Sequence, residues 1–266
     1  MKETILSQLS AECPWRDTLY WFDTIDSTNT KAKMLALSGA PHGTTVIAGS
    51  QSAGRGRLGR SFSSPAGHGM YLSVILRPVC SPDKLMHLTC AAAVAACNAV
   101  EQAAGFRPQI KWTNDLVWGK QKLGGILTEL SVNSQSGLVD FAIVGIGINC
   151  LQCKEDFPAE LQQIATSVYE ASGNRVSPAA MVCAMIESLV QLDFALLSQK
   201  EALLQQYKKD CMTLGKQIVV IRGDDIRYGT AEDLDSDGGL VVRFCDGTVK
   251  TVTSGEVSVR GMYSYV

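Results

Sequence analysis

The sequence predicts a mixed α/β protein in two parts: a larger domain over residues 1–212, built on a mixed β-sheet with helices, and a small β-barrel over residues 213–266. Three observations predict this division. In the first part, β-branched and apolar runs of strand length alternate with apolar runs of helical length. A Gly/Ser/Arg segment without helical period separates two of those strands. From Leu214 onward, short alternating runs are separated by turns such as Asp237-Gly238, which is typical of a small barrel.

The first hundred residues contain clear helix boundaries. Residues 1–13 are predicted to form a short helix and are too few for a helix-turn-helix domain, so no DNA-binding head is expected. The N-cap candidates Asp26-Ser27-Thr28-Asn29 precede a helix from Lys31 to Leu37, which Gly39 stops. A longer helix begins at Ser81-Pro82-Asp83, runs to Ala104 and ends at Gly105.

The strands and the later helices follow from the same patterns. Strands are predicted at 44–48, 70–76, 109–112, 116–118, 123–130 and 138–148, with a hairpin turn at Gly119-Lys120. Helices are predicted near 158–171 and from 177 to 207. The four barrel strands are expected at 217–221, 228–234, 240–244 and 248–252.

Composition restricts the class of function. The 266 residues are 46% hydrophobic and 19% charged, and 24 Lys+Arg against 26 Asp+Glu give a formal charge of −2. Such a balance predicts no non-specific binding to nucleic acid or to a membrane surface. No apolar run has the length of a signal peptide or of a membrane span, so the protein is expected in the cytoplasm.

The nine cysteines form no framework of pairs, which indicates reduced thiols. Cys150 and Cys153 make a C-x-x-C, but a zinc site needs a second pair of ligands, and no further C-x-x-C or paired histidine occurs. The three histidines have neither metal-ligand nor triad spacing. We therefore expect the cysteines to be structural or incidental, rather than a zinc site or a redox site.

The most informative segment is Gly54-Arg55-Gly56-Arg57-Leu58-Gly59-Arg60. Its glycines allow the loop to wrap a ligand, and its arginines suit carboxylate and phosphate oxygens. It also fits G-x-G-x-x-G, but the dinucleotide fingerprint requires a helix to open there, and the Ser/Pro/Gly-rich residues 61–67 make a poor helix start. Taken alone, the segment has a solvated basic turn as its alternative interpretation.

Three further segments carry polar groups at strand ends. Lys111-Trp112-Thr113-Asn114-Asp115 offers hard oxygen ligands suited to the magnesium of a nucleotide, although Asn-Asp is common in ordinary turns. Two glycines inside the strand of Lys122-Leu123-Gly124-Gly125 indicate close approach of a ligand or of another backbone. Gly145-Ile146-Gly147-Ile148-Asn149 repeats this pattern, and a plain buried strand explains its isoleucines equally well.

The order and spacing of these segments resemble the biotin–protein ligases, also called biotin–acetyl-CoA-carboxylase ligases. The matching stretches also include Gln51-Ser52-Ala53, Ser64-Pro65-Ala66-Gly67 and Ser254-Gly255-Glu256-Val257-Ser258, so the resemblance covers roughly residues 20–260. It implies an SH3-like fold for the terminal barrel. It also implies that ATP activates biotin as biotinyl-5′-AMP, which a carrier-protein lysine then attacks. Without room for a DNA-binding domain, the chain resembles the ligase-only kind.

The resemblance also implies a role for each matching residue. Arg57, Lys122 and Lys111 would be catalytic. Biotin would be bound by Ser27, Thr28, Asn29, Gln51, Gly54, Arg55, Lys122, Gly124 and Gly125. ATP would be bound by Arg57, Arg60, Phe62, Lys111, Asn114, Asp115 and Asn149, with magnesium on Asp115. Phe62 stands where many members place a tryptophan that stacks on adenine, and Thr113 where proline is more usual.

Two rival functions remain open at this point. A lipoate or octanoate protein ligase shares the catalytic fold and the carrier-lysine chemistry, but its acid offers Ser27, Thr28 and Gln51 little to bind. A non-catalytic binding module would use the terminal barrel, although residues 214–266 have no basic aromatic patch. The resemblance implies a biotin carrier domain as partner and leaves monomer and homodimer open.

Overall fold

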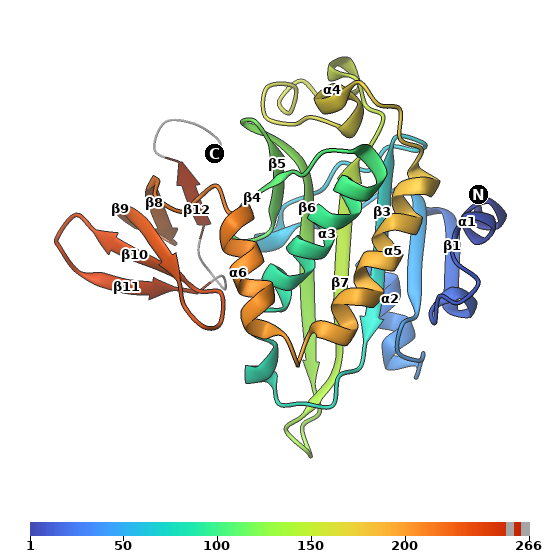
Figure 1. Ribbon diagram of the computed structural model, residues 1–266, viewed down its shortest axis with the longest axis horizontal. Coiled ribbons are helices and arrows are strands. Elements are labelled where there is room, and N and C mark those ends of the chain that lie inside the picture. The colour runs from blue at the N-terminus through green and yellow to red at the C-terminus, as the bar shows by residue number, and fades with distance from the viewer. Residues whose placement is uncertain (254–257, 262–266) are drawn as a thin grey trace.

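The computed structural model describes residues 1–253 and 258–261 and consists of two β-sheets with helices packed around the larger one (Figure 1). The larger sheet has seven strands in the order β1-β2-β3-β7-β6-β5-β4, and the smaller has five in the order β11-β10-β9-β8-β12. Of the motif predicted at 254–258, all but Ser258 lies outside the described residues.

The elements follow one another along the chain as two groups of strands separated by helices. The large sheet contains β1 (Leu19–Ile25), β2 (Thr45–Gln51), β3 (Gly69–Leu76), β4 (Gln109–Lys111), β5 (Asp115–Trp118), β6 (Gln121–Val132) and β7 (Val139–Asn149). The small sheet contains β8 (Gln217–Arg222), β9 (Asp225–Leu234), β10 (Leu240–Phe244), β11 (Val249–Val252) and β12 (Ser258–Gly261). The helices are α1 (Lys2–Gln8), α2 (Thr28–Leu37), α3 (Leu88–Ala104), α4 (Val168–Ser172), α5 (Pro178–Ala195) and α6 (Lys200–Asp210).

The large sheet is mixed, as predicted: β1 pairs with β2 in parallel, and the other neighbouring strands pair antiparallel. Both of its faces are covered. Val74 and Ile75 are consecutive in β3, so their side chains point to opposite faces. Val74 belongs to the main core, which includes residues of α3 and α5, whereas Ile75 belongs to a smaller cluster with Ala32 and Ala36 of α2.

Helices α3 and α5 form the core layer on one face. Helix α3 is rich in alanine, and Gly105 ends it in the left-handed conformation with φ of 77°, as predicted. Helix α5 begins with Pro178, and the side chain of Ser177 accepts a hydrogen bond from the backbone of Ala180.

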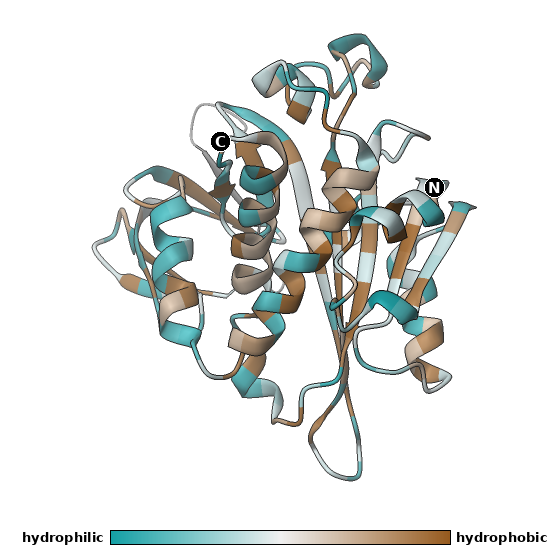
Figure 2. Cartoon of the chain, turned by 45° about the vertical axis from the view of Figure 1, so that its right-hand side comes forward, coloured by the Kyte–Doolittle hydropathy of each residue, from teal (hydrophilic) through white to brown (hydrophobic). Residues whose placement is uncertain are grey.

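Helix α5 is long and apolar enough to cross a membrane by length and composition, contrary to the expectation that no apolar run reaches that length. It is a core helix, however, and 56% of its 18 residues are buried inside the molecule. Figure 2 shows hydrophobic residues gathered in the large sheet and the helices that cover it, whereas α6 is largely hydrophilic.

The small sheet follows α6 and matches the predicted position of the terminal barrel, with all four expected strands present and β12 added. Helix α6 lies between the two sheets in Figure 1 and is tied to the small one by Lys208, whose Nζ lies 2.6 Å from Oδ1 of Asp233. Residue 212, where the sequence predicts the domain boundary, lies between the end of α6 and the start of β8. The division into two domains at this point stays a prediction.

Three predictions of secondary structure were wrong. The helix expected over 158–171 is reduced to α4, and the residues before it are mainly turns. The single helix expected over 177–207 is two helices, α5 and α6, separated at 196–199. The helix expected from Ser81 starts as a 3-10 turn over Pro82–Leu85, and α3 begins at Leu88. Strand β1 was not predicted.

Candidate active site

A cavity of about 510 Å³ lies on the face of the large sheet that α2 covers. Its floor is formed by β6 and β7, and its walls by the start of α2, the end of β2, the arginine loop and the turn after β4. Lining residues are Ser27, Thr28, Asn29, Gln51, Arg55, Gly56, Arg57, Leu58, Arg60, Ser61, Phe62, Lys111, Trp112, Asn114, Asp115, Lys122, Gly125, Ile126, Leu127, Gly145, Ile146, Gly147 and Ile164. Segments more than a hundred residues apart thus meet in one place.

The cavity brings together most of the residues that the sequence singles out. Three of them are not among its lining residues: Gly54, Gly124 and Asn149. Asn149 is buried and donates from Nδ2 to the carbonyl of Thr166 at 2.9 Å, so it fixes the segment that follows β7. Gly124 lets β6 approach β7, because a Cβ there would lie 2.5 Å from the Gly147 carbonyl oxygen.

One end of the cavity is polar and buried. The side chain of Gln51 accepts hydrogen bonds at Oε1 from the backbone N–H of Thr28 at 2.8 Å and from its hydroxyl at 3.1 Å. Its Nε2 donates to the hydroxyl of Ser64 at 2.8 Å. Ser27, Thr28 and Asn29 are each no more than 4% exposed. Hydroxyl and amide groups held in this way can bind a neutral polar head group without adding charge.

The opposite end carries the cations. The ammonium of Lys122 lies 2.6 Å from Oδ1 of Asp115. Nη1 of Arg57 donates to Oδ1 of Asn114 at 3.0 Å. Lys111 is buried and pairs across the β4–β5 ladder with Asp115. Partial burial lowers the pKa of Arg57, and the nearby carboxylate of Asp115 opposes that shift. An arginine keeps its charge under such conditions, so this end is suited to anions.

The arginine loop, residues 54–62, is folded as a small hairpin. Gly54 accepts from Phe62 N–H at 2.8 Å, and Gly56 N–H donates to the carbonyl of Arg60 at 2.7 Å. At its tip, Leu58 has φ of 55°, a left-handed conformation that a non-glycine residue adopts only at a cost. The side chain of Leu58 is exposed, and it also lines the cavity. The loop therefore has a definite shape with a strained tip.

Two glycines of β7 make room for side chains on the cavity floor. A Cβ on Gly145 would overlap the amide of Asn29, and one on Gly147 would lie 2.6 Å from Cε1 of Phe62. The ring of Phe62 thus rests against Gly147, with the ammonium of Lys122 5.9 Å from its centroid. The predicted close approach at these glycines is therefore an approach of the protein's own side chains.

Several residues of the site were not foreseen. Ser73, Glu129 and Ile164 all contact or line it. Ser73 carried a usable signal, since it is a polar residue inside the apolar run of β3. Glu129 carried none, because it alternates normally along β6. Ile164 was assigned to the helix that is not formed.

The arrangement suits two anionic reactants, with the polar end for a neutral head group and the cationic end for carboxylate and phosphate oxygens. Among residues 1–253 and 258–261, no three His, Cys, Asp or Glu side chains are grouped so as to hold a metal ion. At the cationic end of the cavity, the carboxylate of Asp115 and the amide of Asn114 provide hard oxygen donors. They suit a magnesium ion that arrives with phosphate ligands of its own.

The sequence models of two protein families match this chain. "Biotin/lipoate A/B protein ligase family" matches residues 21–149, and "Biotin protein ligase C terminal domain" matches residues 213–260. Together they include both sheets, apart from the ends of β1 and β12.

Curated relatives are ligases of several bacteria. The bifunctional ligase/repressor BirA of Bacillus spizizenii is 44% identical over 62% of this chain and 50% of its own length. The chain thus spans about half the length of the Bacillus relatives it matches. The biotin–[acetyl-CoA-carboxylase] ligase of Mycobacterium tuberculosis is 30% identical over 87% of this chain and 85% of its own length.

A solved structure has a similar fold over most of this chain. The biotin protein ligase of Aquifex aeolicus, in complex with biotin and ATP, superposes with a TM-score of 0.77 at 28% identity, over 92% of this chain and 99% of that one.

Proposed function

Because this chain belongs to the biotin/lipoate A/B protein ligase family, we propose that it activates biotin with ATP and transfers it to a lysine of a carrier protein. The observation that carries this proposal is the juxtaposition, in one cavity, of a buried polar end at Thr28 and Gln51 with the cationic end at Arg57 and Lys122. Biotin has a polar ureido head and a carboxylate at the far end of its chain, so it matches both ends.

In the first step, an oxygen of biotin's carboxylate attacks the α-phosphorus of ATP. A new oxygen–phosphorus bond forms, the bond to the leaving pyrophosphate breaks, and biotinyl-5′-AMP results. The difficulty is electrostatic, since an anion must approach a polyanion. Arg57, Lys111 and Lys122 line the cavity where charge would develop, and fixed cations in a partly desolvated site lower this kind of barrier.

In the second step, a neutral lysine amine of the carrier attacks the acyl carbon of the adenylate. An amide bond forms, AMP leaves with the electron pair, and the amine loses its proton to solvent or to the leaving phosphate. The adenylate must be shielded from water until then. The arginine loop, with exposed Leu58 at its strained tip, stands at the wall of the cavity and is suited to close over it.

Biotin is preferred to lipoate as the acid. Lipoate is apolar at the end remote from its carboxylate, so it offers no hydrogen-bonding group to the polar end of the cavity at Ser27, Thr28 and Gln51. A site built to hydrogen-bond a polar substrate disfavours an analogue that lacks those groups, because the hydrogen bonds to the substrate are not formed. The relatives from Mycobacterium tuberculosis and Paracoccus denitrificans, both named as biotin–[acetyl-CoA-carboxylase] ligases, support the same choice.

We also propose a metal ion, a carrier protein and a cellular location for the reaction. Magnesium would arrive with ATP, held by its phosphates and by Asp115, and would reduce the charge of the triphosphate. The carrier would be the biotin domain of a biotin-dependent carboxylase, and the near-neutral surface favours a protein partner over nucleic acid or membrane. We place the protein in the cytoplasm, where it would act as a monomer or as a homodimer.

The proposal is tested by incubating the protein with Mg-ATP, a biotin carrier domain and either biotin or lipoate, and then weighing the carrier. Biotin is expected to add the mass of one biotinyl group at a single lysine, and lipoate to add nothing. A carrier domain with that lysine replaced by arginine is the control. An unmodified carrier in the biotin reaction would refute the proposal.

A further inference from the structure

Glu129 is a carboxylate that does not line the cavity but contacts two residues that do. It lies on β6, and its side chain is 22% exposed, against 46% for Arg55. Nδ2 of Asn29 donates to its Oε2 at 2.9 Å. Nη1 of Arg55 lies 3.2 Å from Oε2 and 3.3 Å from Oε1. The two partners come from α2 and from the arginine loop, 100 and 74 residues away in sequence.

The contact with Asn29 fixes the direction of a buried amide. Nδ2 of Asn29 also donates to the carbonyl of Leu127 at 3.2 Å, and Oδ1 lies 2.6 Å from the hydroxyl of Ser73. A carboxylate and a carbonyl can only accept, so the NH2 group must face them and Oδ1 must face Ser73. The hydroxyl of Ser73 is in turn 2.8 Å from that of Thr28. Glu129 and the Leu127 carbonyl thus both fix the orientation of Asn29 and, through Ser73, that of Thr28 at the polar end of the cavity.

The contact with Arg55 acts on the loop. Arg55, Arg57 and Arg60 lie within six residues of one another and repel, and Arg55 stands at the base of the hairpin, where it bridges to Ser61. A carboxylate beside that base offsets the repulsion and draws the Arg55 side chain toward β6. Because both contacts use Oε2, the loop and the start of α2 are tied to one anchor.

We propose that Glu129 is a positioning residue, which acts through Arg55 and Asn29 to hold the arginine loop and the polar end of the cavity in one mutual arrangement. Its kinetic consequences rest on the proposed function, whereas its effect on the loop does not. Glu129 itself is not among the residues that line the cavity.

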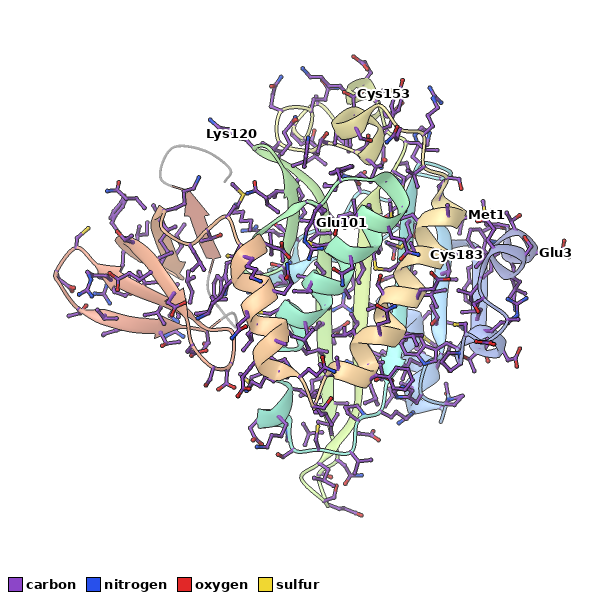
Figure 3. The ribbon with its side chains drawn as sticks, viewed as in Figure 1. Met1, Glu3, Glu101, Lys120, Cys153 and Cys183 are labelled. Carbon is purple, nitrogen blue, oxygen red and sulfur yellow. The ribbon has the colours of Figure 1, made fainter. Side chains whose placement is uncertain are left out.

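Glu129→Gln is the decisive variant, because it keeps the size and one acceptor for Asn29 but removes the charge that attracts Arg55. We expect the KM for biotin to rise about two- to fivefold, the range of a partly exposed ion pair, with kcat unchanged. Glu129→Ala also removes the acceptor, and roughly a tenfold rise or more is expected. Glu3→Gln is the matched control and should behave as wild type, because Glu3 is exposed on α1, at a distance from the cavity (Figure 3).

A double-mutant cycle separates positioning through Arg55 from a general structural role. In an Arg55→Met background, Glu129→Gln should add no further rise in the KM for biotin, since its partner is already gone. Independent, multiplying effects of the two substitutions would overturn the proposal. So would a Glu129→Gln enzyme with the kinetics of wild type.

Limited trypsin digestion tests the same idea without substrates. The bond after Arg55 should be cut faster in Glu129→Gln than in wild type or Glu3→Gln, because the loop loses its anchor. Equal cutting rates would overturn the proposal. Wild-type protein that forms no biotinyl adenylate would refute the proposed function instead, and faster cutting of Glu129→Gln in that protein would still support the anchoring role.

Discussion

The ammonium of Lys122 and the carboxylate of Asp115 meet at 2.6 Å across the β5–β6 hairpin, where both line the cavity. Their side chains are 29% and 17% exposed, so the pair is only partly hydrated. The contact holds the flexible lysine at the cationic end of the cavity and places it beside the groups suited to magnesium. An incoming phosphate or carboxylate would find this cation already in position, which is how preorganised charge assists catalysis.

Lys122→Ala is therefore expected to slow biotin adenylation roughly 10²-fold or more, as is Arg57→Ala, because each removes one charge-stabilising donor. The measurement is the release of pyrophosphate in the presence of biotin and Mg-ATP. Lys120→Ala is the matched control, since Lys120 is exposed at the hairpin turn two residues away (Figure 3). Near-wild-type rates in Lys122→Ala and Arg57→Ala would remove both residues from the mechanism.

Gly145→Ala should destabilise the fold. Its Cβ would overlap the side chain of Asn29, which is buried and held by Ser73, Glu129 and the Leu127 carbonyl. Overpacking of this kind costs about 1–3 kcal/mol in the free energy of unfolding, measured by urea denaturation. In an Asn29→Ala background the cost of the added methyl group should be smaller. The same cost in both backgrounds would show that Asn29 is not the obstacle.

Trp112 links the site to the small sheet. Its indole N–H donates to the buried carbonyl of Gly238 at 3.0 Å, and its own backbone N–H donates to the hydroxyl of Thr213 at 2.9 Å. Trp112→Phe should lower the free energy of unfolding by about 1–3 kcal/mol, because the buried Gly238 carbonyl loses its indole donor and keeps only the long contact with Sγ of Cys90 at 3.9 Å. Trp118→Phe is the control, as Trp118 is 38% exposed. Equal stability of the two variants would contradict the assigned role of this bond.

The burial of His87 predicts that the folded protein loses stability in acid. Burial lowers its pKa below the ordinary value of 6.5, despite the hydrogen bond from the ring to the carbonyl of Leu196. As the pH falls through that ordinary value, the unfolded chain takes up a proton that the folded chain resists, so stability falls. The Tm of His87→Gln should drop less than that of wild type between about pH 7.5 and pH 5.5. Parallel losses in both proteins would exclude His87 as the cause.

Much of the fold was predictable because local patterns and tertiary contacts agree. The glycine at 105 ends α3 as expected, and the strand patterns of β6 and β7 survive almost unchanged. Local patterns and tertiary contacts disagree at residues 158–167, where apolar residues at helical spacing suggested a helix. The main chain of this segment pairs instead with the main chain of Lys122. The N–H of Lys122 donates to the carbonyl of Ile164 at 2.7 Å, and the N–H of Thr166 donates to the carbonyl of Lys122 at 2.9 Å. Edge strand β1 was missed because its residues do not alternate: of the seven, one is buried, three are partly buried and three are exposed.

Site residues could be predicted where the composition of one segment marks them. They could not be predicted where they depend on a contact between two segments that are distant in sequence. The arginine loop and Lys122 stand out by composition, and both line the cavity. The roles of the individual residues in binding and catalysis stay predictions. Glu129 could not be found in this way, since its partner Arg55 is 74 residues distant and nothing local marks the pairing.

The account depends on two anions being joined in the cavity between the arginine loop and β6. A crystal structure with biotin and a non-hydrolysable ATP analogue tests this most directly. We expect Arg57 and Lys122 to contact the biotin carboxylate or the α-phosphate, with the ureido group against Thr28 and Gln51. Ligands bound elsewhere, or these cations turned away from both ligands, would contradict it.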